Sequence, residues 1–130
     1  MRRILVDTHV LIWLLEPKKI INIGKKAQQS IESSDVYVSS ISVSEIIMKS
    51  MIGKLKLENF DNNFISNMNA NELKFSTEHA YILDSFPSLV GHDPFDRMLL
   101  AQAKSEGMIF LTADKVLLGL GLDFVVDASI

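Results

Sequence analysis

The chain has 130 residues, no cysteine and a formal net charge of −3, from 13 basic and 16 acidic residues. This length suits one domain, over residues 1–130, that can bury about two-thirds of the surface its unfolded chain exposes. The absence of cysteine excludes disulfides and thiolate metal sites and fits a cytoplasmic protein. The mild acidity gives no general attraction for nucleic acid, so an enzyme acting on nucleic acid would need bound metal and local basic patches.

The first fifteen residues superficially resemble a secretion signal. Arg2 and Arg3 precede the apolar stretch from Ile4 to Leu15, but Asp7 and His9 interrupt it. No small-residue cleavage site follows, and no apolar run approaches the length that spans a bilayer. We therefore expect a soluble protein that keeps its N-terminus and does not associate with membranes.

Short apolar runs alternate with helical patterns along the chain. In chain order, the sequence predicts a strand at 3–6, helices at 8–15 and 24–34, a strand at 36–39, a helix at 42–52, a weaker Asn-rich helix at 59–69, a strand at 73–75, helices at 76–85 and 93–106, a strand at 109–111, a short helix, and a last strand at 124–126. Strands separated by helices favour a parallel sheet with helices on both faces.

Four acidic residues stand where apolar runs end and helices begin. Asp7 directly follows the first predicted strand, and Asp114 comes shortly after the strand at 109–111. Glu45 and Asp96 fall in the first turns of predicted helices. Ligands of such sheets bind beyond the carboxyl ends of the strands, so we expect all four side chains to reach one crevice.

Each acid also has a simple structural explanation, and taken singly that explanation is favoured. Ser42-Val43-Ser44-Glu45 fits a capping box, Asp93 fits an N-cap followed by a proline, and Asp7 or Asp114 could cap the next helix. Together the acids exceed what capping requires, because Ser or Asn would cap without mutual repulsion. Crowded carboxylates raise one another's pKa, and a hard divalent cation removes that cost.

Four ordered segments carry a resemblance to a known family. They are Val6-Asp7-Thr8-His9-Val10-Leu11-Ile12-Trp13, Ser42-Val43-Ser44-Glu45, His92-Asp93-Pro94-Phe95-Asp96-Arg97-Met98-Leu99-Leu100-Ala101-Gln102-Ala103 and Leu111-Thr112-Ala113-Asp114. The set resembles PIN-domain proteins, and more narrowly the VapC-type toxins of toxin–antitoxin pairs, over essentially the whole chain. The resemblance implies an α/β fold of three α/β/α layers around a central, mostly parallel sheet.

The resemblance further implies a Mg²⁺- or Mn²⁺-dependent endoribonuclease with one or two ions. Its acidic quartet would be Asp7, Glu45, Asp96 and Asp114, with Asp7 and Asp96 as the main ligands and the other two acting directly or through water. Asp93 is interpreted as an N-cap. Thr112 stands where the family often has a Ser or Thr lining the site, whereas Ala113 departs from the larger polar or basic residue of many members.

Basic residues near the acids and surplus apolar residues suggest contacts to a substrate and to partners. Lys49 lies one helical turn after Glu45 and is the best candidate to bind phosphate, and Arg97 adjoins Asp96. The apolar surplus in the first helix, Trp13 included, and at 46–48 exceeds one core stripe, which suits a homodimer or a partner groove. The resemblance implies RNA as substrate and a VapB-like antitoxin as partner.

Two other functional classes remain as alternatives. Phosphatases of the haloacid-dehalogenase type need two acids one residue apart after the first strand, and receiver domains need an acidic pair there. Asp7 is followed by Thr8 and His9, so neither phosphoryl-transfer pattern is met. A non-catalytic PIN-like interaction module is the other alternative, and the intact acidic quartet argues against it.

Overall fold

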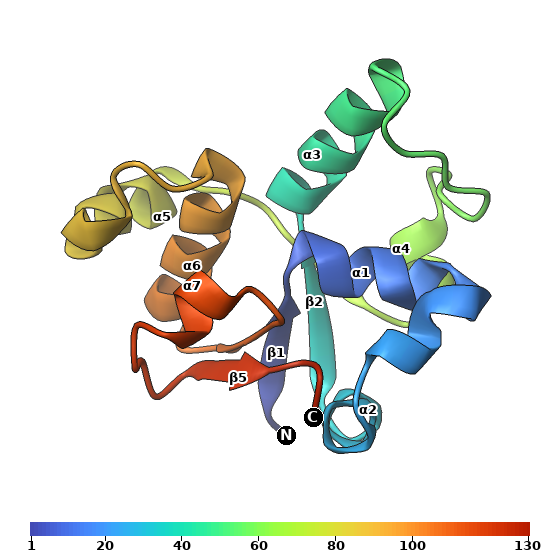
Figure 1. Cartoon of the computed structure of the whole chain (residues 1–130), viewed down its shortest axis with the longest axis horizontal. Coiled ribbons are helices and arrows are strands. Elements are labelled where there is room, and N and C mark those ends of the chain that lie inside the picture. The colour runs from blue at the N-terminus through green and yellow to red at the C-terminus, as the bar shows by residue number, and fades with distance from the viewer.

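The computed structural model describes residues 1–130 and contains one five-stranded sheet in the order β3-β2-β1-β4-β5 (Figure 1). Every strand pair is parallel. The strands are β1 (Arg3–Val6), β2 (Asp35–Ser39), β3 (Asn71–Leu73), β4 (Ile109–Thr112) and β5 (Val125–Asp127). The predicted α/β class with a parallel sheet is confirmed.

Helices connect every pair of successive strands. The α-helices are α1 (Thr8–Leu15), α2 (Lys25–Glu32), α3 (Ser40–Met51), α4 (Phe64–Asn67), α5 (Thr77–Tyr81), α6 (Pro94–Glu106) and α7 (Lys115–Leu118). Three 3₁₀ segments add η1 (Pro17–Asn22), η2 (Ile82–Ser85) and η3 (Pro87–Leu89). None of these helices is long and apolar enough to cross a membrane.

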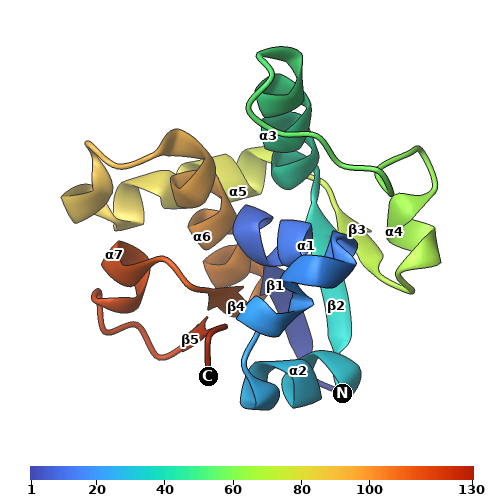
Figure 2. The ribbon, with the colours of Figure 1, turned by 45° about the vertical axis from the view of Figure 1, so that its right-hand side comes forward.

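Two apolar cores lie on opposite faces of the sheet. On one face Ile4 and Val6 pack with α1, α2 and Ile46 of α3. On the other face Leu5 and Phe110 pack with α6 and α7. Figure 2 shows the same division, with α5, α6 and α7 on one side of the sheet and α1, α2 and α4 on the other. Adjacent strand residues alternate between the two cores, as the two-residue period of a strand requires.

Four predicted elements differ from the structure. The strand predicted at 73–75 lies two residues earlier, as β3 at Asn71–Leu73. The Asn-rich segment 59–69 forms only the four-residue α4, and Asn69 takes a left-handed conformation with φ 55°. Asparagine side chains compete for backbone hydrogen bonds, which explains the failure of a long helix there. The helix predicted at 42–52 begins two residues earlier at Ser40, and the helix predicted at 76–85 continues after Tyr81 only as the 3₁₀ segment η2.

The strand order places a topological switch point between β1 and β4. From β1 the chain turns toward β2 and β3, whereas from β4 it turns toward β5. Loops leaving the two central strands therefore diverge and leave a crevice at their carboxyl ends. Asp7 and Asp114 follow these two strands, so the fold delivers two of the four candidate acids to this crevice.

Candidate metal centre

Asp7 is fixed by the strand before it and the helix after it. Its side chain is 3% exposed. One carboxylate oxygen accepts the backbone N–H of Val10 at 2.9 Å and caps α1, and the other accepts the hydroxyl of Thr112. Burial raises the pKa of this carboxyl, while both hydrogen bonds oppose the rise. The capping interpretation of Asp7 is correct, yet a buried acid is a costly cap, because Ser or Asn would do the same work uncharged.

Asp114 is held beside Asp7 through Thr112. Its backbone N–H donates to the Thr112 hydroxyl oxygen at 3.0 Å. One carboxylate oxygen caps α7 by accepting the N–H groups of Val116 and Leu117, at 2.8 and 3.1 Å. Thr112 is fully buried and bonded on both sides. Its hydroxyl therefore orients the two acids and does not face outward.

Asp96 stands in the first turn of α6, whose N-cap is Asp93. The Asp93 carboxylate accepts the N–H groups of Phe95 and Asp96, at 2.8 and 3.2 Å, so the predicted cap is confirmed. The Asp96 side chain therefore does not cap α6. Burial, and then the negative charges of Asp93, Asp7, Asp114 and Glu45, raise the pKa of Asp96 to about 7. All of these acids therefore act on one carboxyl group.

Glu45 is not part of a capping box. Helix α3 begins at Ser40 with Ser39 as its N-cap, so Glu45 lies in the second turn and is out of reach of the helix start. Its side chain is 3% exposed, and one oxygen accepts the ammonium of Lys49 at 2.7 Å. The other oxygen, Oε1, is buried without any hydrogen-bond partner. A buried carboxylate oxygen without a donor is unfavourable unless a cation or a water satisfies it.

His92 connects two of the acids. Its ring Nε2 lies 3.2 Å from Oδ2 of Asp96 and 3.5 Å from Oδ2 of Asp114. Ligand atoms of these three residues lie within 4.8 Å of one another, close enough to share one ion. The sequence alone assigned His92 no role. The only signal in the chain is its position directly before Asp93.

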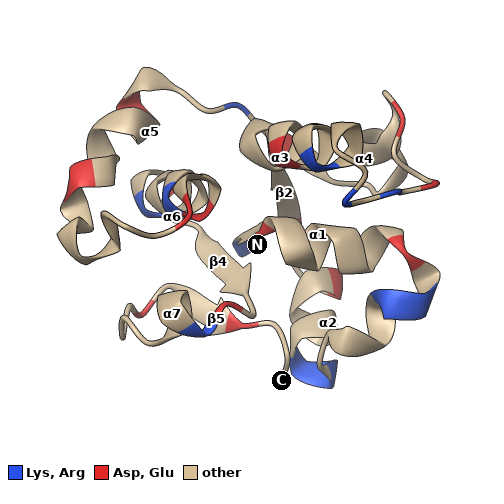
Figure 3. Cartoon of the chain, turned by 45° about the horizontal axis from the view of Figure 1, so that its top comes forward, with Lys and Arg blue, Asp and Glu red and all other residues tan.

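The donor set fits a divalent cation. The structure brings Asp96 and Asp114 together with His92, with ligand atoms within 4.8 Å, whereas Asp7 and Glu45 lie outside this group and act on Asp96 through their charges. Like charges held this close destabilise the apo protein, and a hard cation with oxygen ligands relieves the repulsion. Figure 3 shows acidic segments at the start of α6, within α3 and near β4 and β5.

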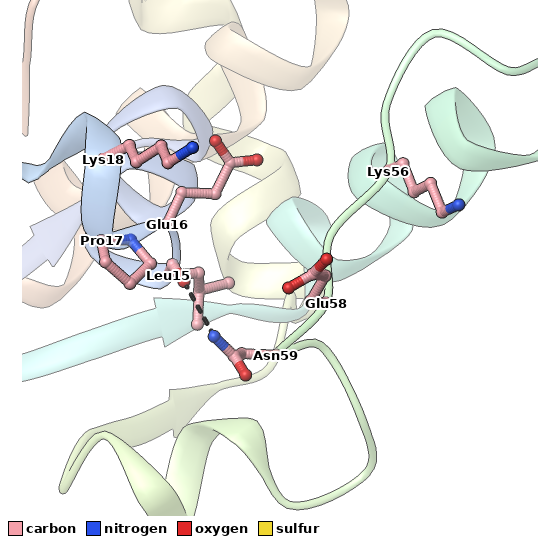
Figure 4. Close-up of a pocket in the computed structure, with 7 residues that line it drawn as sticks. All are labelled: Leu15, Glu16, Pro17, Lys18, Lys56, Glu58 and Asn59. Carbon is pink, nitrogen blue, oxygen red and sulfur yellow. Dashed lines mark hydrogen bonds between the residues drawn. The ribbon is translucent and has the colours of Figure 1, made fainter.

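The hollow next to the acids is not the largest in the molecule. A pocket of about 310 Å³ is lined by Asp7, His9, Trp13, Ala113 and Asp114. A larger pocket, of about 390 Å³, lies between the end of α1 and the loop at 56–59 (Figure 4). It contains two lysines and two glutamates but no convergent donor set. The acidic side chains that line it, and not its volume, therefore identify the pocket of about 310 Å³ as the candidate site.

The other residues expected to contact substrate differ in how exposed their side chains are. The Lys49 ammonium is half-exposed beside Glu45, and its hydrogen bond to that acid raises its pKa, so it stays charged. Arg97 follows Asp96 on α6 and has a buried Nε without a partner. Trp13 packs against the core and also lines the acidic pocket.

Comparisons with known proteins give a consistent result. Three solved structures share the fold: VapBC2 from Rickettsia felis bound to a promoter DNA fragment (TM-score 0.67, 11% identity, 96% of this chain and 98% of that chain), DNA-bound VapBC from Salmonella typhimurium (0.65, 16%, 98% and 98%) and VapBC-1 from nontypeable Haemophilus influenzae (0.64, 15%, 98% and 99%). No curated protein matches the chain in sequence. A family model, that of the PIN domain, matches residues 4–120. With that match, a parallel sheet and acids gathered at its switch point, the chain belongs to the PIN domain family.

Proposed function

We propose that this PIN domain, spanning 1–130, is a Mg²⁺- or Mn²⁺-dependent endoribonuclease and the cytoplasmic toxin of a toxin–antitoxin pair. The observation that carries the proposal is the unsatisfied charge of the crevice. Glu45 keeps a buried oxygen without a donor, and the pKa of Asp96 is raised to about 7. A module that only bound partners would gain nothing from this arrangement, whereas a metal-dependent nuclease needs it.

Asp7, Glu45, Asp96 and Asp114 would hold the ion. A bound divalent ion supplies a nucleophile near neutral pH by lowering the pKa of water, and it offsets charge on the phosphate. Thr112 fixes Asp7 and Asp114 so that little reorganisation is needed on binding. The chain offers oxygen ligands for one or two ions, consistent with either number.

Lys49 and Arg97 are the proposed contacts to substrate. The Lys49 ammonium sits 2.7 Å from Glu45 and is partly exposed, and the charges of Asp93 and Asp96 act on it, so it can bind a phosphate oxygen near these acids. A cation there offsets the repulsion between acids and RNA, which the net charge of −3 does not. Trp13 offers a ring beside the acidic pocket on which a base can stack.

The exposed apolar residues of α3 support a protein partner. Ile47, Met48 and Met51 are 46%, 54% and 80% exposed, and Ile52 after them is 67% exposed. Such a stripe on one helix is typical of an interface. The similar structures are VapBC complexes, some bound to DNA. We propose a VapB-like antitoxin and a second copy of the chain as the partners that cover apolar surface of this kind.

The test is RNA cleavage with Mg²⁺, with and without EDTA, in matched variants. Asp7→Asn and Asp96→Asn should each lose at least about 10³-fold in cleavage rate, since each removes a charge that the ion requires. Asp93→Asn is the control on the same helix, because Asn also caps a helix and should keep most activity. Metal-independent cleavage, or full activity in Asp96→Asn, would contradict the proposal.

A further inference from the structure

We propose that His92 is a nitrogen ligand of the ion held by Asp96 and Asp114, and that the centre therefore takes a first-row transition ion such as Mn²⁺ in preference to Mg²⁺. This inference rests on the metal centre of the proposed function and specifies its chemistry. The sequence alone predicts a centre of oxygen ligands that does not discriminate between the two ions.

The distances fit direct coordination. Nε2 of His92 lies 3.2 Å from the Asp96 oxygen and 3.5 Å from the Asp114 oxygen. Neighbouring ligands about 2.1 Å from one ion are separated by about 3.0 Å in an octahedron and about 3.4 Å in a tetrahedron. The two His92 distances match these separations, and all three ligand atoms lie within 4.8 Å of one another.

A second observation points to a ligand at the same place. Oε1 of Glu45 is buried without a partner, and the charge of Glu45 acts on Asp96. A buried carboxylate oxygen without a donor is unfavourable unless a cation or a water satisfies it. Glu45 lies outside the group of three ligand atoms within 4.8 Å of one another, so it would support an ion there by its charge or through a bound water.

His92 is held in place before any ion binds. Its backbone N–H donates to the Leu89 carbonyl at 2.8 Å, and Asp93 next to it caps α6. The side chain is 20% exposed, so the ring is largely sheltered while Nε2 faces the acids. His9 provides the contrast, because it is exposed, lines the neighbouring pocket and has no carboxylate at hydrogen-bonding distance.

The nitrogen donor decides which ion is preferred. Mg²⁺ is a hard ion that takes oxygen ligands and retains several waters. Imidazole is a common ligand of transition ions, whose affinity for nitrogen sites exceeds that of Mg²⁺ and rises along the Irving–Williams order. One histidine among three or four carboxylates therefore shifts preference toward transition ions without excluding Mg²⁺.

The experiment measures Mn²⁺ and Mg²⁺ affinities by calorimetry in the wild type, in His92→Asn and in the control His79→Ala, which changes a histidine bonded to Ser76 and Glu106 and not to the acids of the site. Asn offers an amide oxygen in place of nitrogen. We expect His92→Asn to lose at least about tenfold in Mn²⁺ affinity and less than about threefold in Mg²⁺ affinity. The control should keep the wild-type ratio. Pulsed EPR of bound Mn²⁺ should show coupling to a ¹⁴N nucleus in the wild type and in His79→Ala, and none in His92→Asn.

Equal losses for both ions in His92→Asn, or no ¹⁴N coupling in the wild type, would overturn the role of His92. The proposed nuclease function is judged separately, by RNA cleavage with each ion. Metal-dependent cleavage without nitrogen coupling would leave the function standing and remove the ligand. Nitrogen coupling without RNA cleavage would confirm His92 as a ligand and contradict the proposed nuclease function.

Discussion

Helix α6 carries two polar clusters. In one of them hydrogen-bond donors and acceptors are paired, and in the other like charges are gathered. At its C-terminal half, Gln102 and Glu106 meet His79 of α5 in a network where each side chain finds a partner. His79 accepts the Ser76 N–H at Nδ1, 3.0 Å away, which leaves Nε2 to donate to Glu106 at 2.7 Å. Gln102 also bonds the Ser39 hydroxyl. At its N-terminal end, Asp96 faces other acids and a carboxylate oxygen without a partner.

The difference separates a structural cluster from a ligand site. In the first cluster donors and acceptors are matched, and the bond between Gln102 and Ser39 ties α6 to the start of α3. In the second, like charges accumulate on the same two helices, which carry Asp96 and Glu45. The hydrogen-bonded network of Gln102, Glu106 and His79, which we call the closed network, thus holds α6 against α3. The acidic cluster around Asp96, which we call the open cluster, pushes these two helices apart. Changes in the two clusters should therefore have opposite effects on stability.

The largest expected effect comes from breaking the closed network. His79→Ala should lower the free energy of unfolding by about 3 kcal/mol, because it leaves a cavity and removes the partner of Ser76 and Glu106. Urea unfolding measures the loss. Glu78→Ala, an exposed neighbour on α5, should change stability by no more than about 0.5 kcal/mol. A loss below about 1 kcal/mol in His79→Ala would show that the network adds little.

Adding metal should stabilise the open cluster by a similar amount. At a free Mn²⁺ concentration one hundred times Kd, the wild type should gain about 2.7 kcal/mol, measured as a rise in Tm. His79→Ala should gain the same increment, because His79 bonds Ser76, Gln102 and Glu106 and none of the four acids. Asp96→Asn should gain much less. An equal gain in Asp96→Asn would place the ion elsewhere in the molecule.

Much of the fold follows from local patterns. The apolar runs predict four of the five strands within a residue, and the helix from Pro94 to Glu106 is marked by its cap, its proline and Gly107 at φ 67°. The start of α3 was not predictable in this way. Serines at 39, 40, 42 and 44 can all cap a helix, and the end of β2 decides for Ser39. That choice removes the capping explanation of Glu45.

The site was predictable as a set of acids but not as a geometry. Asp7 and Asp114 follow from their strands, since parallel strands end at one edge of the sheet. The contact of His92 with Asp114 joins segments separated by a helix and a strand, and no local pattern encodes it. The burial of Thr112 between two acids is likewise a result of register across β1 and β4.

The third prediction uses the pH dependence of stability to measure the repulsion between Asp96 and the neighbouring acids. The pKa of Asp96 is about 7 in the folded protein and near 3.8 in the unfolded chain, so between these values the folded state holds the extra proton. Metal-free stability should therefore fall as pH rises from about 4 to about 7, by about 2 kcal/mol after allowance for solvent screening. Denaturation at several pH values measures the slope. Saturating Mg²⁺ should reverse it, because the ion binds the ionised form.

The smallest effect is the most diagnostic. Asp96→Asn should raise metal-free stability by about 1 kcal/mol at pH 8 and change it little at pH 4, because Asn removes the repelled charge but weakens the contact with His92. Asp93→Asn should give a smaller gain, since it removes only one neighbouring charge and keeps the cap. A destabilised Asp96→Asn protein at pH 8 would mean that Asp96 serves the fold, as Gln102 does at the other half of α6, and the contrast between the two clusters would disappear.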